Sequence, residues 1–179
     1  MCIRDRNCTT PANYFHALRR QIHREFRKPL VIMTPKSLLR HKYCVSNLDD
    51  FNKSNSFHRV LEDHALNKNS KFVKIKKAKK VRKVIICSGK IYFDLLEARE
   101  KNKVDDVIFV RIEELYPFPV KSLTKAIKPY ISNSQFFWCQ EEPKNMGAWS
   151  SVRDYIQWTL DNLGAVSYTH LTLPTIYSV

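Results

Sequence analysis

The chain has 179 residues, of which 44% are hydrophobic, and its formal net charge at pH 7 is +14. This length suits one domain, and the hydrophobic share supports a packed core. No apolar run reaches the length that crosses a bilayer. Cys8, Cys44, Cys87 and Cys139 lack metal-ligand spacing, and two of them fall in apolar runs. The sequence therefore predicts buried thiols in a reducing compartment and excludes a disulfide framework.

The two ends of the chain do not read as parts of a fold. Residues 1–6 (MCIRDR) and 166–171 (VSYTHL) back-translate to DNA strings that are reverse complements over most of their length. No property of a protein imposes that relation, but a sequencing adaptor at both ends does. We therefore expect residues 1–6 and 165–179 to be adaptor-derived and non-native. An exported or disordered tail is the alternative, and no targeting signal can be read.

The first predicted element is an amphipathic helix that starts at Thr10-Pro11 and ends before Pro29. Apolar residues recur in it at every fourth position, with basic residues between them. The pattern predicts a core stripe formed by Tyr14, Leu18, Ile22 and Phe26. It also predicts a basic outer face formed by Arg19, Arg20, Arg24 and Arg27.

A short apolar strand is expected at residues 30–33, then a brief helical piece at 37–40 and a polar, irregular stretch from 43 to 70. Three strand–helix units follow, with strands at 84–87, 107–112 and 136–140 and helices at 91–101, 120–128 and from about 148. This alternation predicts an α/β fold with a mainly parallel sheet and flanking helices. The strand order is left open.

Two features could bind phosphate groups, and each also has a plain structural interpretation, which we favour. Ser88-Gly89-Lys90 is a strand-to-helix turn that could hold an anion. However, the chain has three glycines and neither a dinucleotide fingerprint nor a nucleotide-hydrolase phosphate loop. Residues 71–83 carry eight cations and no acid, which is typical of a nucleic-acid-binding patch or of a solvated loop.

Charged residues gather at the carboxyl ends of two predicted strands, where open α/β sheets bind ligands. Lys36 and Arg40 follow the strand at 30–33, and an anion could dock there unless this is ordinary solvated surface. Glu141 and Glu142 follow the strand at 136–140, and adjacent side chains on extended backbone point in opposite directions. They are a poor acid–base pair, so we interpret them as structural strand-end residues held by cations or by a neighbouring domain. His16 and His23 are interpreted as surface or packing residues rather than metal ligands.

Five segments together resemble one enzyme family in sequence, order and spacing, and the resemblance covers nearly all of residues 7–164. They are residues 9–21 (TTPANYFHALRRQ), 28–41 (KPLVIMTPKSLLRH), 87–99 (CSGKIYFDLLEAR), 110–119 (VRIEELYPFP) and 137–149 (FWCQEEPKNMGAW). The family is the thiamine-diphosphate-dependent 2-oxoglutarate dehydrogenases, and the match is to their carboxyl-terminal part. The segment from 52 to 83 departs from the family by being unusually basic.

The resemblance implies a transketolase-type carboxyl-terminal domain, incomplete, at residues 29–164. Residues 7–28 would end the preceding pyrimidine-binding domain or form a linker helix. In the family, the complete enzyme oxidatively decarboxylates 2-oxoglutarate on thiamine diphosphate with magnesium and passes the succinyl group to lipoamide in the citric acid cycle. Its implied partners are a second copy in a homodimer, a dihydrolipoyl succinyltransferase core and dihydrolipoyl dehydrogenase.

The resemblance places the cofactor motif and the active-site histidines upstream of this chain. We therefore expect no catalytic, cofactor-binding or metal-binding residue here, and a structural, dimerisation or regulatory role without activity in isolation. Lys28 matches a basic family position linked to a regulatory acyl-CoA or nucleotide site, which we extend to Lys36 and Arg40. A lysine keeps the charge there but lacks the planar fork of arginine.

The expected location is the mitochondrial matrix in a eukaryote and the cytoplasm in a bacterium. Three alternatives stay open: a 2-oxoadipate dehydrogenase homologue, a basic nucleic-acid-binding module and a dinucleotide-dependent oxidoreductase. The absent glycine fingerprint counts against the last of these.

Overall fold

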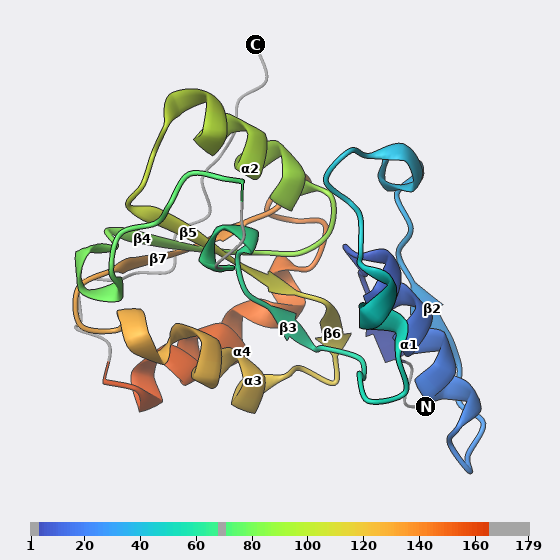
Figure 1. Cartoon of the computed structure of the whole chain (residues 1–179). Helices are drawn as coiled ribbons and strands as arrows, with labels where there is room; N and C mark the ends of the chain where they lie inside the picture. The colour runs from blue at the N-terminus through green and yellow to red at the C-terminus, as the bar shows by residue number, and fades with distance from the viewer. Residues whose placement is uncertain (1–3, 68–70, 165–179) are drawn as a thin grey trace.

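A computed structural model describes residues 4–67 and 71–164, which form two sheets flanked by helices (Figure 1). The main sheet has the strand order β3-β5-β4-β7, with β3 at Val60–Leu61, β4 at Lys83–Cys87, β5 at Val107–Ile112 and β7 at Gln135–Cys139. The smaller sheet has the order β2-β1-β6, with β1 at Arg4–Arg6, β2 at Leu30–Ile32 and β6 at Glu114–Tyr116.

The prediction of an α/β fold is confirmed, and both sheets are mixed. β4 pairs in parallel with β5 and β7, whereas β3 pairs antiparallel to β5. In the smaller sheet, β1 is parallel to β2 and antiparallel to β6. The three parallel strands are those that the strand–helix alternation predicted.

Helices cover both faces of the main sheet, with α2 on one face and α3 and α4 on the other (Figure 1). The α-helices are α1 at Pro11–Ile22, α2 at Ile91–Asn102, α3 at Val120–Ile127 and α4 at Trp149–Asn162. Short 3-10 helices occur at Lys36–Arg40, Leu48–Phe51, His64–Leu66, Ala78–Lys80 and Lys128–Tyr130. The helical pieces expected near 37–40, 91–101, 120–128 and 148 are confirmed.

The core has one layer on each side of the sheet, because alternate strand residues point to opposite faces. Ile86 and Trp138 pack toward α3 and α4, whereas Phe109 packs toward α2 with Tyr92 and Leu96. Such strands, buried on both faces, are expected where helices cover a parallel sheet.

The predicted core stripe of the first helix is wrong. Tyr14, Leu18 and Ile22 are 38%, 41% and 73% exposed, and α1 ends at Ile22, before Phe26 is reached. The buried face instead carries Asn13 and His16, together with two alanines. The polar face turns inward because its side chains hydrogen-bond to the rest of the fold, as described below.

The amino-terminal residues take part in the fold where the structure describes them. Residues 4–6, which we expected to stand outside the fold, form β1, and their backbone fills the gap between β2 and β6. This pairing says nothing about how these residues arose, so their adaptor origin stays a prediction. Residues 1–3 and 165–179, to which the same prediction applies, lie outside the described residues.

The predicted burial of the thiols is confirmed for Cys87 and Cys139, and Cys8 is also buried, while Cys44 is half-buried. Burial raises the pKa of all four thiols. No helix within residues 4–67 and 71–164 is both long and apolar enough to cross a membrane.

We expect Leu96→Ala to lower the free energy of unfolding by about 2–5 kcal/mol, because it opens a cavity beneath α2 at a fully buried position. Urea unfolding followed by circular dichroism measures this. The matched control is Leu48→Ala at a position that is 89% exposed, where the change should stay within about 0.5 kcal/mol. Equal losses in the two variants would show that α2 does not pack on this core.

Candidate functional site

The strand-end glutamates singled out in the sequence have separate surroundings. Glu141 forms an ion pair with Lys90, with 2.5 Å between Oε1 and Nζ. This pairing raises the pKa of Lys90. The Lys90 ammonium also lies 3.7 Å from Asp94 in α2. Glu142 is exposed, and its carboxylate lies beside Gly147, whose φ of +69° is a left-handed conformation that favours glycine.

The turn that carries Lys90 is occupied by internal contacts. Gly89 adopts a φ of +77°, a left-handed conformation that favours glycine. A side chain at Gly89 would also meet Asn7. Ser88 donates a hydrogen bond from Oγ to the carbonyl of Ile112 at 2.9 Å. These contacts favour the structural interpretation of the turn over a phosphate site.

Gln140 organises the strand-end loop, a role that the sequence did not reveal. Its Nε2 donates to the carbonyl oxygens of Glu142, Pro143 and Met146 at 2.8–3.1 Å. Its Oε1 accepts from the Trp138 indole at 2.9 Å and from the backbone N–H of Trp149 at 3.0 Å. One carboxamide therefore closes the turn between β7 and α4.

The residues proposed for an anion site, Lys28, Lys36 and Arg40, all lie exposed on the surface. Lys28 precedes β2, whereas Lys36 and Arg40 follow it in the 3-10 helix. The next two residues, His41 and Lys42, both lie near the Glu97 carboxylate, with nitrogen–oxygen distances of 3.8 and 3.2 Å. The regulatory anion site stays a prediction.

Glu113, directly after β5, is a fully buried carboxylate that binds the start of α1 and the residues before it. It accepts hydrogen bonds from the backbone N–H of Thr9 and from Nδ2 of Asn13, both at 2.9 Å, and from the Thr9 hydroxyl. Arg111 donates to the same Thr9 hydroxyl at 3.0 Å. Burial raises the pKa of Glu113, while Arg111 and these hydrogen bonds act in the opposite direction.

Glu114, the next residue, is also fully buried and turns to a set of arginines. It pairs with the buried Arg6, and its Oε2 lies 2.7 Å from Nε of Arg59. Arg20 in α1 approaches at 3.8 Å. The two glutamates therefore bind the amino-terminal segment to the end of β5 through separate sets of donors.

A second buried ion pair joins α2 to the segment that follows β3. Asp63 accepts two hydrogen bonds from the Arg99 guanidinium, one of them at 3.0 Å, and both side chains are at most 3% exposed. Asp63 also accepts from the backbone N–H groups of Ala65 and Phe109, each at 3.0 Å. Every lone pair of this carboxylate is thereby directed at a donor.

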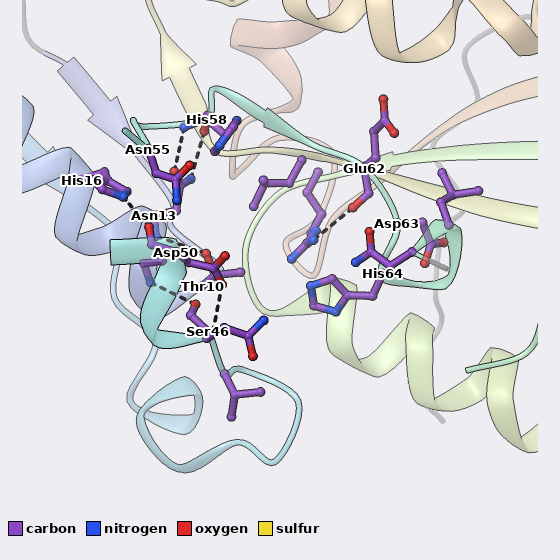
Figure 2. A pocket seen from close by; sticks show the side chains of 17 residues that line it. Thr10, Asn13, His16, Ser46, Asp50, Asn55, His58, Glu62, Asp63 and His64 are labelled. Carbon is purple, nitrogen blue, oxygen red and sulfur yellow. Dashed lines mark hydrogen bonds between the residues drawn. The ribbon is translucent and has the colours of Figure 1, made fainter. Parts of the chain in front are cut away.

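A cavity of about 450 Å³ lies between α1, the segment 45–67 and β5 (Figure 2). His16, His58 and His64 line it, together with Asn13 and Arg111. His16 donates from Nε2 to the carbonyl of Asp50 at 2.7 Å. Burial, reinforced by the Arg111 charge, lowers the pKa of His64 to about 4, so its imidazole is neutral near pH 7.

This cavity can offer hydrogen bonds to a polar molecule, but it does not assemble a catalytic set. The hydroxyl of Ser46, one of the lining residues, accepts a hydrogen bond from the backbone N–H of Ala12 at 3.1 Å. Among the described residues, no group of histidine, cysteine and acidic side chains could hold a metal ion. The lining comes from three distant stretches of sequence, and no local pattern signals it.

Replacing Asp63 by Asn should lower the free energy of unfolding by about 3 kcal/mol, because the buried Arg99 charge loses its counter-charge. The control is Asp154→Asn, which removes an exposed carboxylate from a surface pair and should cost less than about 0.5 kcal/mol. Urea unfolding at pH 7 measures both. A similar small loss in the two variants would contradict a tightly coupled pair.

The neutral His64 should make the protein less stable as the pH falls from 6.5 toward 4. The unfolded state takes up a proton at this residue near pH 6.5, whereas the folded state does so only near pH 4. The stability is intact above pH 6.5, and about 2–3 kcal/mol should be lost by pH 4. His64→Gln should flatten this part of the pH profile of unfolding, and His23→Gln, at an exposed position, should leave it unchanged.

Two family models match consecutive parts of the chain. The model described as "Transketolase, pyrimidine binding domain" covers residues 6–42, and the one described as "2-oxoglutarate dehydrogenase C-terminal" covers residues 45–173.

Relatives from Brucella species are each named 2-oxoglutarate dehydrogenase E1 component. The Brucella anthropi protein is 52% identical over 169 residues, which are 92% of this chain and 17% of the relative. Those of Brucella abortus strain S19 and Brucella ovis are 53% and 52% identical over 159 residues, 89% of this chain and 16% of each relative. The chain thus spans about a sixth of these relatives. By its family match and these identities, the chain belongs to the 2-oxoglutarate dehydrogenase E1 family.

Proposed function

We propose that this chain is the carboxyl-terminal part of an E1 component that oxidatively decarboxylates 2-oxoglutarate and transfers the succinyl group to lipoamide. The observation that carries the proposal is the consecutive match of two family models, the end of a pyrimidine-binding domain followed by a carboxyl-terminal domain. The names of the relatives favour 2-oxoglutarate over 2-oxoadipate as the substrate.

The proposal includes thiamine diphosphate and magnesium as cofactors of the complete enzyme. The described residues do not fit either group, because they hold no cluster suited to a metal ion and the turn at Lys90 is filled by internal pairs. The cofactor would therefore be held by other parts of the enzyme. The chain's own residues then contribute architecture rather than chemistry.

The architectural contribution is a rigid junction between two domains. The donors to Glu113 and Glu114 include Arg6, Thr9 and Asn13, which precede the boundary between the two family matches. A junction fixed by buried charge pairs would hold the pyrimidine-binding domain at one orientation to the carboxyl-terminal domain. In this proposal the latter has the mainly parallel transketolase-type arrangement.

The exposed face of α1 supports the assignment of residues 6–42 to a larger domain. Phe15 and Leu18 are each 41% exposed, and Ile22 is 73% exposed on the same helix. Neighbouring apolar side chains of this kind are normally covered in a soluble enzyme. The remainder of the pyrimidine-binding domain would cover them.

The remaining parts of the proposal concern the assembly. The enzyme would be a homodimer that works with a dihydrolipoyl succinyltransferase core and dihydrolipoyl dehydrogenase. Its location would be the cytoplasm of a bacterium or the mitochondrial matrix of a eukaryote. An acyl-CoA or another anion would regulate it through Lys28, Lys36 and Arg40.

A chimera tests the proposed function. Residues 7–164 of this chain replace the matching segment of the Brucella anthropi enzyme, and 2-oxoglutarate-dependent reduction of an artificial electron acceptor is measured. We expect turnover in the chimera and none in the isolated chain, since the cofactor would be bound elsewhere. The Brucella enzyme with this segment deleted is the control and should be inactive. A folded but inactive chimera, or turnover by the isolated chain, would contradict the proposal.

A further inference from the structure

The basic segment 71–83 is a structured ridge rather than a loose loop. Four of its apolar residues recur at every third position and pack against the two core clusters: Phe72, Ile75, Ala78 and Val81, followed by Val84 in β4. Val81 and Val84 are almost completely buried. This spacing leaves Lys74, Lys76, Lys77, Lys79 and Lys80 exposed between the inward residues. We call the outer surface of residues 71–83 the lysine ridge.

The backbone of the lysine ridge is anchored at several points. Lys76 donates its N–H to the carbonyl of Asp105 at 2.9 Å, and Arg82 donates to that of Asp106 at 2.8 Å. Further back, the N–H of Val73 donates to the Glu100 carboxylate at 2.9 Å. The lysine side chains therefore project from fixed positions, which lowers the entropy lost on binding a partner.

Few acids neutralise the ridge. Lys76 and Arg82 form ion pairs with Asp105 and Asp106, at 2.8 and 3.0 Å. Lys83 lies over the Phe137 ring. The other lysines of the ridge are exposed and have no ion-pair partner within the described part of the chain: Lys71, Lys74, Lys77, Lys79 and Lys80.

Neighbouring elements extend this surface. The 3-10 helix Ala78–Lys80 lies against the one at Lys128–Tyr130, and Asn133 donates to the Lys79 carbonyl at 3.2 Å. Lys128 is exposed there. The ridge leads into Lys83, which pairs with Val107 and Gln135 at the amino-terminal ends of the parallel strands. The lysine ridge lies at the end of the main sheet that is farther from α1 (Figure 1).

We propose that the lysine ridge docks an acidic, flexible polypeptide segment of a partner protein. Lysine ammonium groups on flexible stems suit a row of carboxylates in an extended chain, which needs no planar or bidentate recognition. Disordered acidic segments are common in proteins and bind extended surfaces of opposite charge.

Nucleic acid fits the ridge less well. Single strands bind by stacking bases on exposed aromatic rings. The one aromatic residue in the segment, Phe72, turns inward, with its ring centroid 5.2 Å from that of Tyr43 and 6.3 Å from that of His64. Proteins that bind duplexes usually place a helix or a β-ribbon in a groove. The ridge presents only the three-residue turn Ala78–Lys80.

The test is fluorescence anisotropy of the whole chain with a labelled poly-glutamate peptide at rising salt concentrations. The ridge variant changes Lys74, Lys77, Lys79 and Lys80 to Gln. We expect it to bind at least about tenfold more weakly, because four exposed charge contacts are lost, and to unfold like the parent chain in urea. The matched control changes Lys53, Lys121, Lys125 and Lys144 to Gln, all exposed and outside the ridge, and should bind the peptide as the parent does.

Each other outcome overturns the proposal. If poly-glutamate did not bind at low salt, the proposed docking surface would be contradicted. Equal losses in the two variants would show that net charge alone attracts the peptide. Competition experiments identify the class of partner. Tighter binding of a single-stranded oligonucleotide of equal charge would point to nucleic acid instead of an acidic peptide. Tighter binding of vesicles that contain phosphatidylserine would point to a membrane. These results do not depend on the activity of the chimera, so this inference and the proposed function can fail separately.

Discussion

The buried charges of Glu113 and Glu114 determine how the amino-terminal segment meets the main sheet. A carboxylate withdrawn from water costs several kcal/mol unless donors surround it. These two adjacent residues lie at the start of β6, and they turn to different donors, Thr9 and Asn13 for the first and Arg6 for the second. A shift of β1 or α1 would leave one carboxylate unpaired. Polar groups therefore hold the segment in one register, beside a small buried apolar cluster of Cys8, Ala17 and Phe57.

The same constraint organises the irregular stretch that follows β3. Asp63 lies beside a two-residue strand and accepts four hydrogen bonds, including those from Arg99. Arg99 in turn stacks over the Phe109 ring at 4.6 Å. One buried ion pair thus fixes the backbone conformation of a segment that has little regular secondary structure. Buried polar networks of this kind favour a single arrangement because any slip leaves a charge without its partner.

The sequence predicted the parts of the fold that follow from hydrophobic periodicity. β4, β5 and β7 and the helices after them appear where the apolar runs placed them. β3 and β6 were missed because two or three residues carry no periodic signal. The predicted orientation of α1 is wrong because its apolar stripe is not its buried face: the fold buries Asn13 and His16 instead. The sequence pattern singled out Glu141 and Glu142, whereas the adjacent glutamates that are buried and surrounded by donors are Glu113 and Glu114.

Arginine and lysine differ in burial in this chain, and this difference separates the charges that stabilise the fold from those that remain on its surface. The buried cations in the described residues are Arg6, Arg99 and Arg111, and no lysine is among them. A guanidinium can satisfy several acceptors at once, whereas an ammonium keeps its hydration and stays outside. The charges that the architecture requires are therefore paired and internal. Those of the ridge satisfy no buried acceptor, and mutual repulsion among them opposes folding. Five ridge lysines form no ion pair within the described residues, so their charge contributes nothing to the core beneath them, which supports the proposed binding of an acidic partner.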